Sequence, residues 1–260
     1  CGWNFNTEQI LASLLKQGSN IPQIVLINQL TEESISDILS HFTDLKIKFV
    51  YGDFTKEAVL NRANIKFAQS VIILPDSSVA LSEKSDERTI LATLSIKSIN
   101  SKIKVYAHII DRENMSHIKK AKADEVLISD AYTGFLLAAH VLEPGIPQTV
   151  DQLFSEESPH NLSRTDANTG YSGKTIGEIR QQFLEEDGSL VLGIGRETEG
   201  VNVMDILSDD YSYLDQFIKR KFEEAGRGLG SENSVKINLN PDANTVLEDK
   251  DFLILLKSGV

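Results

Sequence analysis

The stretch that decides the fold is Cys1–Thr7, CGWNFNT, at the start of the chain. It has the spacing of the G-x-G-x-x-G turn that joins the first strand of a dinucleotide-binding fold to its first helix. Gly2 keeps the glycine that makes the turn. Asn4 stands where the second glycine lets backbone approach a pyrophosphate, and Thr7 stands at the third. The stretch predicts the scaffold of a nucleotide site with an altered phosphate-binding surface, which favours sensing over hydride transfer.

A strand of roughly five residues normally precedes that glycine. We therefore expect the natural chain to continue upstream of Cys1.

Strand-like and helix-like segments alternate after this turn. The continuous apolar run at 23–28 predicts a parallel strand buried on both faces. Further strands are predicted at 46–51, 70–74, 104–109 and 125–128. Helical spacing predicts helices at 31–41, 56–63, 87–99 and 113–121. Thr31 is the expected N-cap of the first of these helices. The apolar face of helix 87–99 is expected to be Ile90, Leu91, Leu94 and Ile96. The alternation predicts an α/β fold, a Rossmann-like doubly wound parallel sheet.

The next segment, 133–143, is apolar around almost its whole circumference, so its helix must be buried by its own domain or by a partner. A Pro-Gly hinge follows, and 150–154 is expected to form one more short helix. The polar segment 158–172 is predicted to be a linker.

The last part of the chain has a different pattern and predicts a small α+β lobe. Its predicted elements are a helix at 175–184, strands at 189–195, 235–239 and 251–257, and a helix at 205–225 within an insertion at about 203–233. We therefore expect a Rossmann-like lobe at 1–130, crossover and dimerisation helices at 131–157, and a C-terminal α+β lobe at 158–260.

Composition excludes several classes of protein. The net charge is −12, of which residues 1–150 contribute −2 and residues 151–260 contribute −10. An acidic chain without a cluster of Lys and Arg predicts no binding to nucleic acid. The single cysteine excludes an internal disulfide framework, and no apolar run reaches about 18 residues.

Several stretches together resemble the regulator of K+ conductance (RCK) domain, whose relatives include regulatory subunits of Trk-type potassium uptake systems. They are Cys1–Asn4, Tyr51–Thr55, Ala63–Ile65, Ser85–Thr89, Arg112–Asn114, Ala123–Val126, Gly173–Ile179 and Leu247–Leu253. The resemblance covers nearly the whole chain apart from the insertion. The loss of two glycines, which is frequent in channel-attached domains of this family, favours the channel branch.

The resemblance implies a ligand-sensing gating-ring domain that regulates a potassium channel and has no enzymatic activity. It further implies homodimers that pair through the helices at 131–157 and assemble into a tetrameric or octameric ring. The ring would lie at the cytoplasmic face of the cell membrane, below a transmembrane pore domain of the same protein. The alternatives are a Trk-type regulatory subunit and, from another class, an NAD-dependent oxidoreductase.

A ligand of such a fold lies at the carboxyl ends of the strands. The candidate walls are Gly2, Trp3, Asn4, Asn28, Asp53, Phe54, Thr55, Pro75 and His108. The family resemblance implies an acidic residue at the position of Asn28 in nucleotide-binding members, whereas asparagine keeps one acceptor and adds donors. Two alternatives are open for the crevice. It binds an adenine nucleotide or NAD as effector, or it is empty. For the Trp3 side chain the alternatives are stacking on a base of the ligand and packing in the core.

Asp86 is the candidate metal ligand, with Ca2+ as the cation. In a calcium-gated relative, a carboxylate at this position works with two acids on the fifth strand. Here those positions are His108 and Ile110. The alternative is that Asp86 is the N-cap of helix 87–99. The acidic stretch 197–210 either binds cations or is a solvated loop. The sequence contains no G-x-S-x-G nucleophile elbow and no pair of histidines at the i, i+4 spacing of a zinc-binding helix, so it gives no indication of catalysis.

Overall fold

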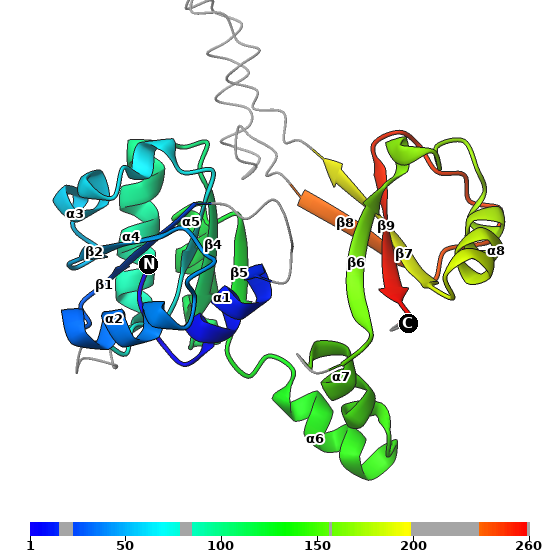
Figure 1. Ribbon diagram of the computed structural model, residues 1–260, viewed down its shortest axis with the longest axis horizontal. Coiled ribbons are helices and arrows are strands. Elements are labelled where there is room, and N and C mark those ends of the chain that lie inside the picture. Colours follow the sequence, from blue (N-terminus) through cyan, green and yellow to red (C-terminus); the bar gives the residue numbers. More distant parts are fainter. Residues whose placement is uncertain (16–22, 79–84, 156–157, 199–233, 259–260) are drawn as a thin grey trace, which may run out of the picture. The chain divides into compact units, whose positions relative to one another are not determined.

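The computed structural model (Figure 1) describes residues 1–15, 23–78, 85–155, 158–198 and 234–258. The chain divides into two compact units, Cys1–Leu137 and Ala138–Val260, and each is described by itself. The insertion at about 203–233 and the helix predicted at 205–225 lie outside the described residues, as does most of the acidic stretch 197–210.

The first unit is built on parallel strands. One sheet pairs β1 (Ile24–Asn28) with β2 (Ile47–Tyr51), and a second has the order β3 (Ser70–Ile73), β4 (Lys104–Ile109), β5 (Glu125–Ile128). Backbone hydrogen bonds join both sheets to the start of the chain. The Gly2 amide donates to the Ile27 carbonyl at 2.9 Å, and the Leu74 amide donates to the Cys1 carbonyl at 2.9 Å. The parallel α/β fold predicted from the sequence is confirmed.

The helices of this unit follow their strands as predicted. They are α1 (Asn6–Leu15), α2 (Glu32–Ser40), α3 (Glu57–Arg62), α4 (Ser85–Ile99) and α5 (Met115–Lys120), with short 3-10 turns at Ile65–Phe67 and Arg112–Asn114. Thr31 caps α2 by accepting a hydrogen bond from the Ser34 amide. Ile73, Ile96 and Val105 lie in the main core of the unit, so α4 packs on strands β3 and β4.

The predicted apolar face of α4 is wrong at two positions. Leu91 and Leu94 are 50% and 48% exposed, whereas the buried face holds Thr89, Ala92 and Thr93. Each threonine hydroxyl donates to the backbone carbonyl four residues earlier, at 3.1 and 2.8 Å. Because the helix itself satisfies these hydroxyls, small polar side chains can face the sheet without loss of hydrogen bonds.

Helix α6 (Thr133–Leu142) forms where the apolar segment predicted it, but most of it is exposed. Phe135, Leu137, Val141 and Leu142 are all more than half exposed, and Ala139 is buried. Helix α7 (Ile146–Phe154) is longer than the helix expected at 150–154, because Pro147 is accommodated in its first turn. None of the helices in the described ranges is both long and apolar enough to cross a membrane.

The second unit contains a four-stranded antiparallel sheet in the order β6-β9-β7-β8. Its elements are β6 (Asn161–Asp166), α8 (Ile176–Glu186), β7 (Leu190–Thr198), β8 (Ser234–Leu239) and β9 (Asp251–Lys257). Ile176, Ile179 and Phe183 of α8 pack with the buried side chains of β7 and β9. A capping box between Thr175 and Glu178 begins α8.

The linker predicted at 158–172 is wrong, because this segment contains β6 and a 3-10 turn at Ala167–Thr169. Strand β6 is an edge strand that pairs along its whole length with β9. Most of its side chains are exposed, so its polar sequence NLSRTD lacks the apolar alternation of a half-buried strand.

Candidate functional site

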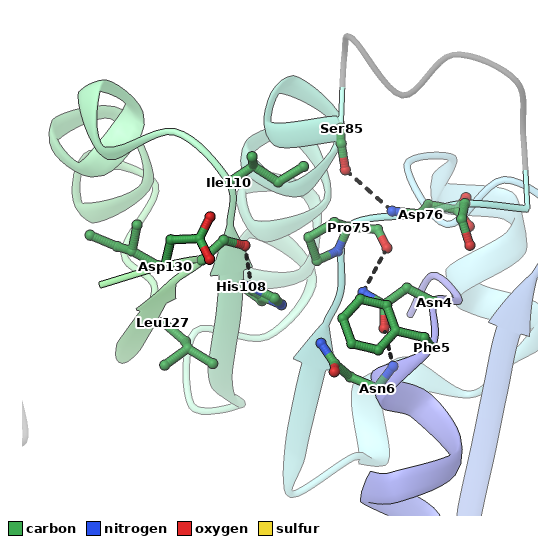
Figure 2. A pocket seen from close by; sticks show the side chains of 13 residues that line it. Asn4, Phe5, Asn6, Pro75, Asp76, Ser85, His108, Ile110, Leu127 and Asp130 are labelled. Carbon is green, nitrogen blue, oxygen red and sulfur yellow. Dashed lines mark hydrogen bonds between the residues drawn. The ribbon is translucent and has the colours of Figure 1, made fainter. Parts of the chain in front are cut away.

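An open pocket of about 620 Å³ lies at the carboxyl ends of β3, β4 and β5, beside the Cys1–Thr7 loop (Figure 2). Its described lining residues are Asn4, Phe5, Asn6, Pro75, Asp76, Ser77, Ser85, His108, Ile110, Leu127, Ile128, Ser129 and Asp130. Figure 2 shows Phe5 and Asn6 on one side of the pocket and Leu127 and Asp130 on the other. The position is that of a ligand crevice in an open α/β sheet.

Gly2 makes the turn that brings the loop to this pocket. Its φ of +82° lies in the left-handed region, and a Cβ atom there would stand 2.5 Å from the Leu74 carbonyl oxygen. Only glycine accepts both conditions without strain. The residue identity at this position therefore follows from backbone geometry, independently of any ligand.

The loop and the first turn of α1 use most of their own amide groups. The Asn4 amide donates to the Thr7 hydroxyl at 3.0 Å, and the Asn6 amide donates to the Asn4 side-chain oxygen at 3.0 Å. The Asn4 side-chain nitrogen donates to the Pro75 carbonyl at 3.1 Å. The two residues that replace glycines in the fingerprint, Asn4 and Thr7, thus cap the helix end to which a pyrophosphate would bind.

Asp76 is the other acceptor at this loop, and its side chain is only 1% exposed. Its carboxylate accepts the Trp3 amide at 3.2 Å and the Ser78 amide and hydroxyl at 3.1 and 2.6 Å. The Arg88 guanidinium lies 3.1 Å from the same carboxylate and 3.3 Å from that of Asp53. Arg88 therefore pairs with two carboxylates, those of Asp53 after β2 and Asp76 after β3.

Burial raises the pKa of Asp53, but hydrogen bonds from Thr55 and the nearby Arg88 charge outweigh it, so the pKa lies below its ordinary value. Arg88 also stacks over the Phe54 ring, 4.9 Å from its centroid. This guanidinium is consequently shared among groups of the chain itself.

The structure brings only some of the predicted wall residues together. Asn4, Pro75 and His108 line the pocket; the predicted residues outside its lining are Gly2, Trp3, Asn28, Asp53, Phe54 and Thr55. Trp3 is buried, which fits its core alternative. The exposed aromatic side chain is Phe5, at 83%, which the sequence reasoning missed. Its place directly before α1 was the available signal, but sequence spacing could not tell which of the two aromatic side chains faces outward.

Asn28, at the end of β1, is fully buried. Its side-chain oxygen accepts the Leu30 amide at 3.0 Å, whereas its side-chain nitrogen has no hydrogen-bond partner among the described residues. Its assignment to a ribose site stays a prediction.

His108 lies on β4 and faces the pocket (Figure 2), where its Nε2 is 2.9 Å from the Ser129 hydroxyl. Burial lowers the pKa of His108, and the charge of Asp86 offsets this only in part. The lowered pKa favours the neutral imidazole, which presents one donor and one acceptor.

Asp86 lies inside α4, so its prediction as N-cap of that helix is wrong. Its carboxylate accepts the Ile110 amide at 2.8 Å, the Asp111 amide at 2.9 Å and the Asn114 side-chain nitrogen at 2.8 Å. It holds the turn that follows β4. Within the described part of the chain, no three or more His, Cys, Asp or Glu side chains are grouped to hold a metal ion. The Ca2+ assignment of Asp86 stays a prediction.

The sequence profile of the TrkA-N domain matches residues 1–129, which include the whole of this pocket except Asp130. Residues 1–129 belong to the TrkA-N domain family. The match confirms the family resemblance inferred from the sequence motifs.

Two curated proteins are similar to the TrkA-N domain and the residues beyond it. The calcium-gated potassium channel TvoK of Thermoplasma volcanium is 24% identical over 187 residues, 71% of this chain and 51% of TvoK. The Bacillus subtilis protein YugO is 22% identical over 220 residues, 84% of this chain and 63% of YugO. The chain thus spans about half to two thirds of the length of these relatives.

Among solved structures, the human SLO3 gating ring matches with a TM-score of 0.60. The match has 14% identity and covers 98% of this chain and 43% of that chain. At this identity the similarity shows a shared fold.

Proposed function

We propose that this chain is a ligand-sensing, non-enzymatic domain that regulates a potassium channel from the cytoplasmic face of the membrane. The observation that carries the proposal is the open pocket of its TrkA-N domain, at the position where such sheets bind ligands. The similarity to TvoK, a calcium-gated potassium channel, supports the channel assignment.

The pocket walls give a ligand a way to act on the chain. They come from the loop before α1, the segment after β3 and the ends of β4 and β5. A ligand that contacts several of these segments at once favours the conformation in which the distances between the segments fit the ligand. It therefore shifts the population between two states by its difference in affinity for them.

Assembly into a ring is the second part of the proposal. The exposed apolar side chains of α6 (Phe135, Leu137, Val141 and Leu142) leave this helix in need of a covering partner. A second copy of the chain, packed through α6 and α7, supplies that cover in a homodimer. We propose that such dimers form a tetrameric or octameric ring joined to a pore domain.

Two other functions make different predictions. A Trk-type regulatory subunit would control potassium uptake through a separate transport protein, whereas a channel domain acts on a pore in its own protein. Potassium flux through liposomes that contain only the full-length protein distinguishes these two. An oxidoreductase would oxidise a nicotinamide cofactor with turnover, which absorbance at 340 nm measures.

The direct test of sensing is thermal unfolding of the chain with ATP, ADP, AMP, NAD, NADH, Ca2+ and Na+, one at a time. A ligand at 100 times its Kd stabilises the folded state by about 2.7 kcal/mol. We expect a saturable rise in melting temperature with at least one of these ligands or with the nucleosides tested below. Size measurement by light scattering should report dimers or larger species. An unchanged melting temperature with every ligand would overturn the sensing function.

A further inference from the structure

We infer that the pocket selects a phosphate-free heterocyclic ligand of the nucleoside class, because the Asp76 carboxylate already takes the hydrogen-bond donors beside the Cys1–Thr7 loop. The inference rests on the proposed sensing function and specifies the ligand. A Rossmann-like fold implies a dinucleotide, so the first question is whether the residues present fit a pyrophosphate.

The hydrogen-bond donors beside the loop are already used. The Trp3 amide, the Ser78 amide and hydroxyl, and Arg88 all bind the Asp76 carboxylate. A phosphate that used these donors would have to displace the Asp76 carboxylate, whose side chain is only 1% exposed. The loop therefore does not fit a pyrophosphate as it stands.

The helix end beside it is also satisfied. The amides of Asn4, Asn6 and Thr7 are bonded to groups within the same short segment. A helix N-terminus attracts an anion through its free amides, so this one has lost most of that attraction.

The charge of the pocket acts in the same direction. Its described lining residues include two carboxylates, Asp76 and Asp130, and neither Lys nor Arg. A phosphomonoester carries about two negative charges at pH 7. Arg88 pairs with Asp76 and offsets its charge, so the repulsion comes mainly from the exposed carboxylate of Asp130; a neutral or cationic ligand meets no such penalty.

The remaining walls suit a flat ring with polar edges. Phe5 presents an exposed aromatic face, and Ile110 and Leu127 supply apolar surface elsewhere in the pocket (Figure 2). Bases stack on such aromatic side chains irrespective of their identity. The neutral His108 beside Ser129 offers hydrogen-bonding groups to the edge of the ring.

The test compares four nucleosides (adenosine, guanosine, cytidine and uridine) with their 5′-monophosphates, ATP and NAD by calorimetry at low and physiological salt. We expect at least one nucleoside to bind, and its monophosphate to bind at least tenfold more weakly. The difference should shrink as salt rises, because screening weakens the repulsion.

Variants assign the effect to residues. Phe5→Ala should weaken nucleoside binding about tenfold, whereas Phe67→Ala removes an aromatic side chain of similar exposure, 75%, outside the pocket lining, and should not change it. Asp76→Asn should improve monophosphate binding at least tenfold relative to nucleoside binding. Asp130→Asn removes the same charge from an exposed position and should change this ratio less. If Asp76→Asn does not fold, the ratio of monophosphate to nucleoside affinity in the unmodified chain still tests the exclusion of phosphate.

The outcomes separate the two proposals. Tighter binding of a phosphorylated ligand, or stabilisation by Ca2+ or Na+ alone, would overturn the ligand class while sensing stands. Binding of no ligand from either panel would overturn both. An equal loss of nucleoside affinity in Phe5→Ala and Phe67→Ala would remove the pocket as the site.

Discussion

Replacement of Asp86 by alanine tests the account of this residue as the group that holds the turn after β4. The buried carboxylate accepts three hydrogen bonds, two of them from backbone amides that alanine leaves without a partner. Hydrogen bonds to a charged group contribute about 1.5–3 kcal/mol each, and water entering beside the turn recovers part of the loss. We expect the Asp86→Ala variant to lose about 3 kcal/mol of the free energy of unfolding. For a unit of this size the melting temperature falls by about 6–12 °C.

Two further variants make the measurement decisive. Asp86→Asn keeps one acceptor oxygen and should lie between the unmodified chain and Asp86→Ala. Glu87→Ala removes an exposed charge from the same first helical turn and should cost less than about 1 kcal/mol. Urea denaturation without added metal gives the three values. The reasoning is refuted if Asp86→Ala is within about 0.5 kcal/mol of Glu87→Ala, a difference small enough for ordinary surface substitutions. A loss that appears only when Ca2+ is present would instead support metal binding by Asp86.

Three other predictions concern separate features. Gly2→Ala should cost at least about 2 kcal/mol, because it combines a left-handed φ with a contact of 2.5 Å to a carbonyl oxygen. Gly134→Ala, at an exposed helical position with no atom within 4 Å of the new Cβ, should be neutral or stabilising by up to about 1 kcal/mol; equal losses in urea denaturation would contradict the backbone explanation. The pKa of His108 is below its ordinary value in the folded state, so the unfolded chain takes up the proton first as pH falls through about 6.5. Stability should therefore fall between pH 7.5 and 5.5 in the unmodified chain and fall less in His108→Gln, and parallel pH profiles would disprove this. Thr175→Ala removes the N-cap of α8 and should lower the free energy of unfolding of the second unit by about 1 kcal/mol. Urea denaturation followed by the helix signal measures this loss, and an unchanged midpoint would contradict it.

The sequence predicted the elements whose position is marked by neighbouring residues, either by the apolar positions of a strand or by the cap of a helix. The strand Ile24–Asn28 is a continuous apolar run with no exposed residue, whereas Lys104–Ile109 buries Val105, Ala107 and Ile109 on one face in simple alternation. Helix starts were visible where a threonine side chain caps the first turn, as at Thr31 and Thr175. In these cases the signal is local, so a short window of sequence contains it.

The sequence could not predict features that depend on partners far along the chain. The contact between Asp76 and the Trp3 amide joins residues 73 positions apart, and nothing near Asp76 indicates an acceptor for that loop. Strand β6 is polar because it lies at an edge, which its own residues do not reveal. The buried threonines of α4 look polar in the sequence, although the helix satisfies their hydroxyls internally.

The first turn of α4 holds three loops at once. Ser85 accepts the Asp76 amide at 3.2 Å, Asp86 accepts the amides after β4, and Arg88 reaches the carboxylate after β2. The three loops are therefore anchored to the same helical turn. Fraying of this helical turn would release all of them together, so hydrogen exchange of their amides should report one common opening free energy. The rim of the pocket is in this sense one cooperative unit, and the stability of the first turn of α4 sets its opening free energy.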